Sequence, residues 1–467
     1  MKASLLLFLL VIGALLPSEA TAQSTPPNIV VFIADDAGWR DFGCYGNAAI
    51  RTPNIDRLAQ QGMRFDQVFL TTPQCSPTRT SLLAGQYAHT LRTEDLHEPL
   101  AEGQTILPTH LKKAGYYTGL IGKTHIGLVG EAKFDLVEPL KQSEPQPDDF
   151  KTLLDSAQDQ PFFVWYAFSD PHRGYQPNTI DEPHDPDQVV VPPYLVDTPE
   201  TRRDLAQYYD EIGRLDRNVG RVLQLLEEAG KASNTAIFFL SDNGKPFTRA
   251  KGTLYDAGIR TPLVVRWPEQ VDASSTYGGL LSAIHLAPTI MDMAGVAVDT
   301  AMVGRSLLPI LTRNAVVPDE FVFSERNWHD CDEHMRSVRS DSFKLIKNAY
   351  IEWPHGTAAD LAGSPSHQAL LRGKAQDRLT DAQQLVFEVP RPEIEFYNVK
   401  VDPYELTNLA YDVRYRPQIQ THYAALRRWQ QQTDDFPPHV RRRYDNTDRV
   451  TGTMYHIGRP ESYGNDN

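Results

Sequence analysis

Residues 29–36 read IVVFIADD, six consecutive apolar residues followed by two aspartates. A continuous apolar run of this length, rich in β-branched residues, is typical of a strand buried on both faces of a parallel sheet. Three further runs share this character and span residues 116–121, 162–168 and 236–240. The sequence therefore predicts a mostly parallel central sheet.

Helical patterns separate these strands. Residues 54–62, 109–115 and 198–230 each end on a glycine, and the longest has apolar residues at helical spacing throughout. Strands that alternate with helices indicate an α/β domain whose sheet is flanked by helices.

The pattern changes after residue 315. Short strands are expected at residues 321–323, 335–338, 343–346 and 395–401, and a helix at 419–432. These elements predict a smaller C-terminal subdomain with an antiparallel sheet and a packing helix. From residue 436 the chain is polar, which is typical of a loose or wrapping tail.

The amino terminus has the three parts of a secretory signal peptide. Met1-Lys2 is followed by an apolar segment from Leu5 to Leu16 and by small residues up to Ala22. The apolar segment is too short to span a bilayer. We therefore expect a signal peptide at residues 1–22, a catalytic domain at 23–315 and a C-terminal subdomain at 316–467. The predicted location is exported, either periplasmic or secreted by a bacterium.

The composition limits the partners. There are 46 Lys and Arg residues against 60 Asp and Glu, a formal charge of −14. So acidic a chain argues against nucleic acid or anionic membranes as partners. Cys44, Cys75 and Cys331 are too few for a disulfide framework and allow at most one bridge.

Polar residues follow each of the four buried runs. They are Asp35 and Asp36, Lys123 and His125, His172, and Asp242 and Asn243. Ligands of open α/β sheets bind outside the carboxyl ends of the strands, so we expect these side chains to meet at one edge.

Three carboxylates and an amide at one edge predict a cation. Asp35, Asp36, Asp242 and Asn243 offer oxygen atoms, which suit Ca²⁺ or Mg²⁺ better than zinc. A single Asp after a strand is more often a helix N-cap, but acidic residues after two similar strands favour the metal. Lys123, His125 and His172 would then be cations or proton carriers beside it.

Residues 75–85 read CSPTRTSLLAG. This run resembles the signature of the type I sulfatases of the alkaline-phosphatase superfamily, in which the cysteine is oxidised to formylglycine (3-oxoalanine). The resemblance extends from Asn28 to about Leu409 and includes the Asp pair upstream and the Gly-Lys-x-His run downstream. The alternative reading of Cys75 is a small buried hydrophobic residue.

The resemblance implies a role for each matching residue. Asp35, Asp36, Asp242 and Asn243 would hold one Ca²⁺ together with residue 75. Arg79 and Lys123 would position the formylglycine and its sulfate, and His125 would hydrogen-bond a hydroxyl of the hydrated aldehyde. His172 and Lys251 would face the sulfate and the leaving group.

Within this family the chain resembles the sulfamidases, which act on N-sulfated glucosamine. Residues 76–77 with their flanks, 170–173, 242–247 and 335–338 carry that likeness. Lys251 stands where we expect arginine, and residues 325–330 look different. The candidates for sugar recognition are Glu325, Arg326, His329, Asp330 and His334. The alternative reading of these residues is an ordinary solvated connection at the domain junction.

The predicted function is an exported sulfatase that removes an N-sulfate or an O-sulfate ester from a sulfated oligo- or polysaccharide. Two alternatives are a phosphate or phosphonate monoester hydrolase of the same superfamily and a non-catalytic glycan-binding relative. The implied partners are the glycan and a formylglycine-generating or maturase enzyme, and a homodimer is compatible with the sequence.

Overall fold

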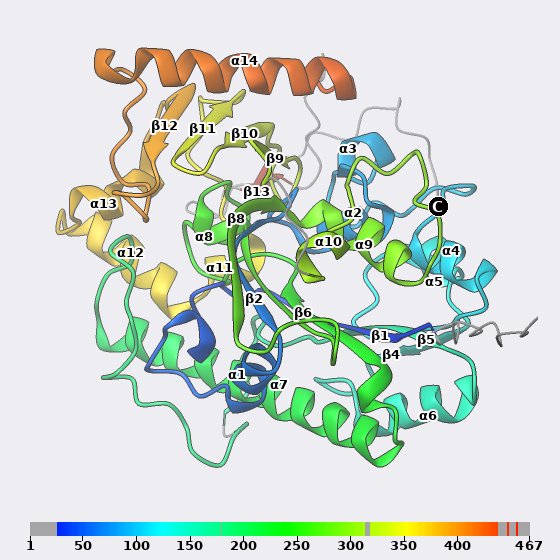
Figure 1. The fold of residues 1–467 in the computed structure, drawn as a ribbon. Helices are drawn as coiled ribbons and strands as arrows, with labels where there is room; N and C mark the ends of the chain where they lie inside the picture. Colours follow the sequence, from blue (N-terminus) through cyan, green and yellow to red (C-terminus); the bar gives the residue numbers. More distant parts are fainter. Residues whose placement is uncertain (1–25, 178, 313–317, 438–445, 448–453, 456–467) are drawn as a thin grey trace, which may run out of the picture.

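A large mixed sheet forms the centre of the protein in the computed structural model, which describes residues 26–177, 179–312, 318–437, 446–447 and 454–455 (Figure 1). Its eight strands lie in the order β4-β3-β5-β1-β6-β7-β2-β8. Within this sheet β7 runs antiparallel to both of its neighbours, and every other pair is parallel. The predicted α/β class with a mostly parallel sheet is confirmed.

The four predicted strands occupy the middle of this sheet. They are β1 (Asn28–Ala34), β3 (Tyr117–Gly122), β5 (Phe162–Ala167) and β6 (Thr235–Ser241). β1 pairs with β5 on one side and with β6 on the other, and Ala34 lies opposite Ser241. Because these strands are buried along almost their whole length, their sequences are continuously apolar.

The sequence patterns missed the remaining strands of this sheet. These are β2 (Met63–Phe69), β4 (Leu136–Pro139), β7 (Arg260–Arg266) and β8 (Ser275–Ser282). β4 and β8 are the edge strands and are partly exposed. β7 contains Pro262, and prolines usually argue against an interior strand.

Helices cover both faces of the sheet. α7 (Pro199–Glu228) packs on one face with α1 (Pro53–Gln60) and α6 (Pro147–Ala157). The other face carries α2 (Cys75–Ala84), α4 (Leu107–Lys113) and α9 (Leu286–Met293). The helices predicted at 54–62, 109–115 and 198–230 correspond to α1, α4 and α7 with small changes at their ends.

The predicted antiparallel sheet is present after residue 318. Its order is β12-β11-β10-β9, and the strands are β9 (Val322–Arg326), β10 (Met335–Arg339), β11 (Phe343–Asn348) and β12 (Ile394–Asn398). α14 (Arg416–Thr433) lies across this sheet and buries Leu426 and Trp429 against it (Figure 1). Between β11 and β12, α12 (Pro365–Ala375) returns to the large domain and packs on α7.

The remaining α-helices and strands of the described chain are short. They are α3 (Ala88–Leu91), α5 (Gly127–Glu131), α8 (Asp256–Ile259), α10 (Leu308–Leu311), α11 (Ala359–Ala362), α13 (Asp381–Gln384), β13 (Asn446–Thr447) and β14 (Met454–Tyr455). The expected signal peptide, and most of the tail after residue 436, lie outside the described residues.

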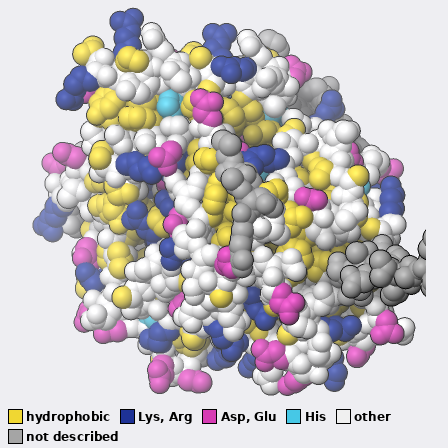
Figure 2. All heavy atoms as spheres, in the orientation of Figure 1, with side chains coloured by type: hydrophobic (Ala, Val, Ile, Leu, Met, Phe, Trp, Pro, Cys, Tyr) yellow, Lys and Arg dark blue, Asp and Glu magenta, His cyan; other side chains and the backbone are white. Residues whose placement is uncertain are grey.

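Two sequence-based expectations about the surface and the cysteines can be compared with the structure. Figure 2 shows basic and acidic side chains interspersed on the face in view, without one extended basic area. Cys44, Cys75 and Cys331 form no disulfide bond with one another. Across the described ranges, we find no helix that is both long and apolar enough to cross a membrane.

A buried polar cluster joins the small sheet to the rest of the chain. Arg336 on β10 forms a two-pronged ion pair with Asp435, just beyond α14, at 2.5 Å for both hydrogen bonds. The same guanidinium lies 3.8 Å from Glu325 of β9, which also accepts from the ring of His89 on α3 at 2.9 Å. The cluster therefore connects α3, β9, β10 and the end of α14.

Arg336→Met should lower the free energy of unfolding by about 3–5 kcal/mol, because Asp435 would stay buried without the cation of its two-pronged ion pair. Chemical denaturation measures this change. Arg414→Met is the matched control, since the Arg414 side chain is 78 % exposed beside Asp412. Equal denaturation midpoints for the two variants would show that the cluster contributes no stability.

Candidate active site

The carboxyl ends of β1 and β6 bring the acidic residues together. Asp35 and Asp36 follow β1, and Asp242 follows its neighbour β6. One ligand atom from each of these three residues and the Sγ atom of Cys75 lie within 4.8 Å of one another. All four side chains are buried, so the edge predicted from the sequence is a single compact cluster.

The backbone at these strand ends is held in place. The Asp36 amide donates to Asp242 Oδ1 at 3.1 Å, and Asp36 has a φ of 73°, a left-handed conformation that aspartate tolerates better than most residues. A Cβ atom at Gly244 would lie 1.8 Å from the carbonyl oxygen of Ala257. At Gly122, with a φ of 94°, it would lie 2.0 Å from the carbonyl oxygen of Ala167. Glycine is therefore required beside both the acidic cluster and Lys123.

Cys75 is the first residue of α2, and Gln74 precedes it in extended conformation. The amide nitrogen of the Gln74 side chain donates to the Trp328 carbonyl at 2.7 Å, which ties this turn to the C-terminal part. Cys75 is 2 % exposed, and burial raises the pKa of its thiol well above the ordinary value. An unmodified Cys75 is therefore a protonated thiol near neutral pH and a poor nucleophile.

Three buried or half-buried cations surround the carboxylates. Arg79, on α2, contacts Asp242 Oδ2 through Nε and one terminal nitrogen, both at 2.8 Å. Lys123 forms an ion pair with Asp35, and Lys251 lies 2.7 Å from Asp36 Oδ2.

These cations lower the pKa of the neighbouring carboxyl groups, whereas burial raises it. Burial alone would raise the pKa of Asp35, but Lys123, His172 and Arg79 hold it well below its usual value. Asp242 differs, because burial raises its pKa to about 6 despite the neighbouring Arg79.

The donor atoms fit a hard cation. Asp35 Oδ1 and Asn243 Oδ1 are buried, and neither accepts a hydrogen bond from any described residue. Unsatisfied buried oxygens are costly, and a metal ion beside the carboxylates would satisfy them. The donors other than Cys75 are carboxylate and amide oxygens, which suit Ca²⁺ or Mg²⁺.

Two of the predicted histidines lie beside this cluster. His172 Nε2 is 3.9 Å from Asp36 Oδ2, and its Nδ1 lies 2.7 Å from the Arg173 carbonyl oxygen. His125 Nε2 is 2.8 Å from Nδ1 of His97. Burial, followed by the positive charges of Lys123 and Arg79, lowers the pKa of His125 to about 2. His125 is therefore neutral at ordinary pH.

A cavity of about 670 Å³ opens onto these residues. Of the predicted site residues, it is lined by Cys75, Lys123, His125, His172, Lys251, His329 and Asp330. His97 and Asp360 also line it, and the sequence patterns missed both. Neither follows a buried strand, so the signal that identified the other residues does not exist for them.

The remaining sugar-recognition candidates do not line this cavity. Glu325 belongs to the cluster with Arg336 and His89, and His334 is 4 % exposed, with Nε2 3.9 Å from Asp435. Arg326 is 1 % exposed and lies against Gly252.

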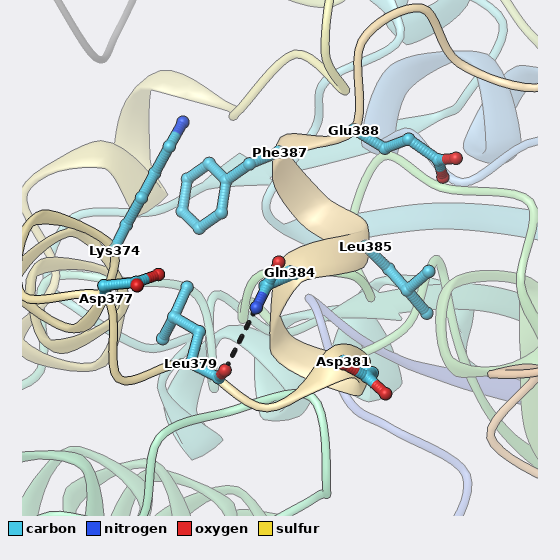
Figure 3. Close-up of a pocket in the computed structure, with 8 residues that line it drawn as sticks. All are labelled: Lys374, Asp377, Leu379, Asp381, Gln384, Leu385, Phe387 and Glu388. Carbon is cyan, nitrogen blue, oxygen red and sulfur yellow. Dashed lines mark hydrogen bonds between the residues drawn. The ribbon is translucent and has the colours of Figure 1, made fainter.

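A second hollow, of about 510 Å³, lies where α12 meets α13 (Figure 3). Lys374 lies 4.2 Å from the Phe387 ring, and Gln384 donates to the Leu379 carbonyl at 3.1 Å. The charged side chains that line this hollow are exposed, and none of the predicted site residues is among its lining residues. The cavity at Cys75 is therefore the better candidate for chemistry.

Comparisons with known proteins identify the family of the chain. The sulfatase family model matches residues 27–141 and 143–296. A second model, the C-terminal domain of N-sulphoglucosamine sulphohydrolase, matches residues 248–383. Together these matches include the acidic cluster and the described residues that line the cavity.

Two individual relatives resemble the chain over most of its length. The chain is 32 % identical to human N-sulphoglucosamine sulphohydrolase over 90 % of its own length and 93 % of the relative. It is 28 % identical to an ulvan-active sulfatase of Formosa agariphila over 88 % of its length and 76 % of that relative.

Solved structures share the fold. One is a protein in complex with its substrate D-glucosamine-2-N,6-O-disulfate, with a TM-score of 0.69 at 21 % identity, covering 89 % of this chain and 99 % of that one. Another is a phosphonate monoester hydrolase of Agrobacterium radiobacter, with a TM-score of 0.67 at 18 % identity, covering 87 % and 96 %. On its family-model match and its identity to the human sulphohydrolase, this chain belongs to the sulfatase family of hydrolytic enzymes.

Proposed function

We propose that the protein is an exported sulfatase that hydrolyses sulfate groups on a sulfated glycan, with residue 75 converted from cysteine to formylglycine. The observation that carries this proposal is the position of Cys75. It lies at the start of a buried helix, with its sulfur grouped with three carboxylates. The buried thiol is protonated, so the unmodified side chain is poorly suited to attack sulfur.

Asp35, Asp36, Asp242 and Asn243 would hold one Ca²⁺ ion together with residue 75. Bound there, Ca²⁺ would supply positive charge beside the oxygens of residue 75 and of a sulfate group. The hydrate of formylglycine offers two hydroxyl groups on one carbon, so that one can bond to sulfur and the other can later expel sulfate.

The surrounding side chains would bind and orient the sulfate. Lys123 pairs with Asp35, and Lys251 pairs with Asp36. Both lysines line the cavity and would offer their charge to sulfate oxygens. Arg79 is fully buried behind them, and its hydrogen bond to the Lys123 carbonyl at 3.0 Å helps to fix that strand end.

The two histidines would move protons. His172 Nε2 faces the acidic cluster and would donate a proton to the leaving atom of the substrate. His125 lines the cavity with residue 75 and would accept a proton from the second hydroxyl of that residue.

The substrate is a sulfated oligo- or polysaccharide. The human relative is named for N-sulphoglucosamine and the Formosa relatives for ulvan, which supports a glycan and leaves both N-sulfates and O-sulfate esters as candidates. The C-terminal part from residue 316 would complete the substrate pocket, because His329, Asp330 and Asp360 line the cavity. Export through residues 1–22, conversion of Cys75 by a formylglycine-generating or maturase enzyme, and a homodimeric assembly belong to the same proposal.

Mass spectrometry of the peptide that contains residue 75 tests the nucleophile. Natively produced protein should carry formylglycine there, and Cys75→Ala should abolish sulfate release without changing the thermal unfolding midpoint. Unmodified cysteine together with no sulfate release would refute the proposal. Faster turnover of a phosphate monoester than of the matching sulfate ester would favour the phosphatase alternative.

Removal of the metal tests the acidic cluster. Chelation should stop turnover, and Ca²⁺ should restore it. Ca²⁺ at 100 times its dissociation constant should also stabilise the fold by about 2.7 kcal/mol. Asp242→Asn should lose this Ca²⁺-dependent stabilisation. If the unfolding midpoint of the chelated wild type does not change when Ca²⁺ is added, the site does not bind Ca²⁺.

The neutral state of His125 can be tested by NMR. Its folded pKa lies below the unfolded value of about 6.5, so the folded protein binds fewer protons there than the unfolded chain. The associated stability is present above pH 6.5 and decreases as the pH falls below it. The ring nitrogen signals of His125 should stay constant between about pH 5 and 8. A titration midpoint near 6.5 would contradict this environment.

A further inference from the structure

Asp360 brings an additional carboxylate to the cavity. It lies on α11, far along the chain from the strand ends, and lines the same cavity as Cys75. Asp360 Oδ2 is 2.7 Å from Lys251 Nζ and 3.5 Å from His172 Nε2. Lys251 thus lies between Asp360 and Asp36, which it contacts at the same distance.

A carboxylate is an unexpected neighbour for a sulfate group, because the two negative charges repel. Although burial would raise the pKa of Asp360, Lys251 and His172 hold it below its usual value, so this residue is ionised. Its other oxygen, Oδ1, is buried and accepts no hydrogen bond from any part of the chain that the structure describes. Oδ2, the oxygen beside His172, accepts from Lys251 and keeps a second lone pair for a further hydrogen bond.

The leaving atom of the substrate is the group that would lie nearest. A leaving atom that takes a proton from His172 must lie within about 3 Å of Nε2, and so beside Asp360. In a sulfamate this atom is a nitrogen that carries a hydrogen. In a sulfate ester it is an oxygen that carries none and presents lone pairs to the carboxylate. The products differ in the same way, because a released amine becomes an ammonium ion and a released alcohol stays neutral.

We propose that Asp360 determines specificity for nitrogen as the leaving atom: it accepts the N–H of an N-sulfated sugar and then pairs with the released ammonium group. Asp360 thereby favours N-sulfated over O-sulfated substrates at this site. This inference rests on the proposed sulfatase function and names the substrate class for it.

The first test compares Asp360→Asn with the wild type on N-sulfoglucosamine and on 4-nitrophenyl sulfate. The ratio of the two kcat/KM values should shift toward the O-sulfate by at least about tenfold, since a charge-assisted hydrogen bond to the nitrogen is lost. Asp381→Asn is the matched control. It removes the same charge from an exposed position on α13, outside the cavity that contains Asp360, so the ratio should stay near the wild-type value.

The second test needs no turnover. Calorimetry should show that the wild type binds D-glucosamine more tightly than N-acetylglucosamine, and that Asp360→Asn loses this preference while Asp360→Glu keeps most of it. Thermal unfolding checks that each variant is folded, and Asp360→Ser replaces the Asn variant if that protein does not fold.

The outcomes separate this inference from the proposed function. Sulfate release with equal substrate ratios in wild type and Asp360→Asn would overturn the role of Asp360 and leave the sulfatase function standing. Amine-selective binding that depends on Asp360, in a protein that releases no sulfate, would support Asp360 and refute the proposed function.

Discussion

The structure depends on three carboxylates that meet at the ends of two neighbouring strands. Burying ionised groups costs several kcal/mol each unless charges of opposite sign accompany them. Arg79, Lys123 and Lys251 supply those charges, each from a different part of the chain. The same arrangement that makes the cluster tolerable also gives a positive lining to the cavity above it. The balance of charge therefore serves both stability and the binding of an anion.

The strand ends and the helix start that carry this cluster could be predicted because each has a local signal. A strand buried on both faces must be continuously apolar, and the polar residues that follow it mark the edge of the sheet. Asp35, Lys123, His172 and Asp242 were all found in this way. The run that begins at Cys75 was recognised by its resemblance to a family. The small sheet was found from short apolar segments, which α14 and the large domain cover in the structure.

The rest could not be predicted, because it depends on contacts between distant parts of the chain. Asp360 lies on a single turn of helix after an irregular segment, and nothing nearby in the sequence marks it as a cavity residue. Glu325 was a candidate for sugar recognition because residues 325–330 look different from the corresponding segment of the sulfamidases. Its two oxygens instead accept from the amide and the ring of His89, and this partner is 236 residues away in the sequence. A local pattern cannot distinguish a charge that faces a ligand from one that faces another charge.

The site has two parts, the acidic cluster and the residues that face it from the C-terminal part, and only the first could be predicted well from local sequence patterns. The acidic cluster is built on strand ends and on a buried helix, where the backbone is fixed by pairing on both sides. The residues that face it from the C-terminal part lie on loops and on α11, which the small sheet supports indirectly. Gln74, the residue immediately before Cys75, links the two parts, because its side chain donates a hydrogen bond to the Trp328 carbonyl. Apart from this link, strand pairing holds the carboxylates in place, so a change in the C-terminal loops can alter the shape of the pocket without moving them. The fixed part would keep the cleavage chemistry constant, while the loops allow the choice of sugar and of leaving atom to vary.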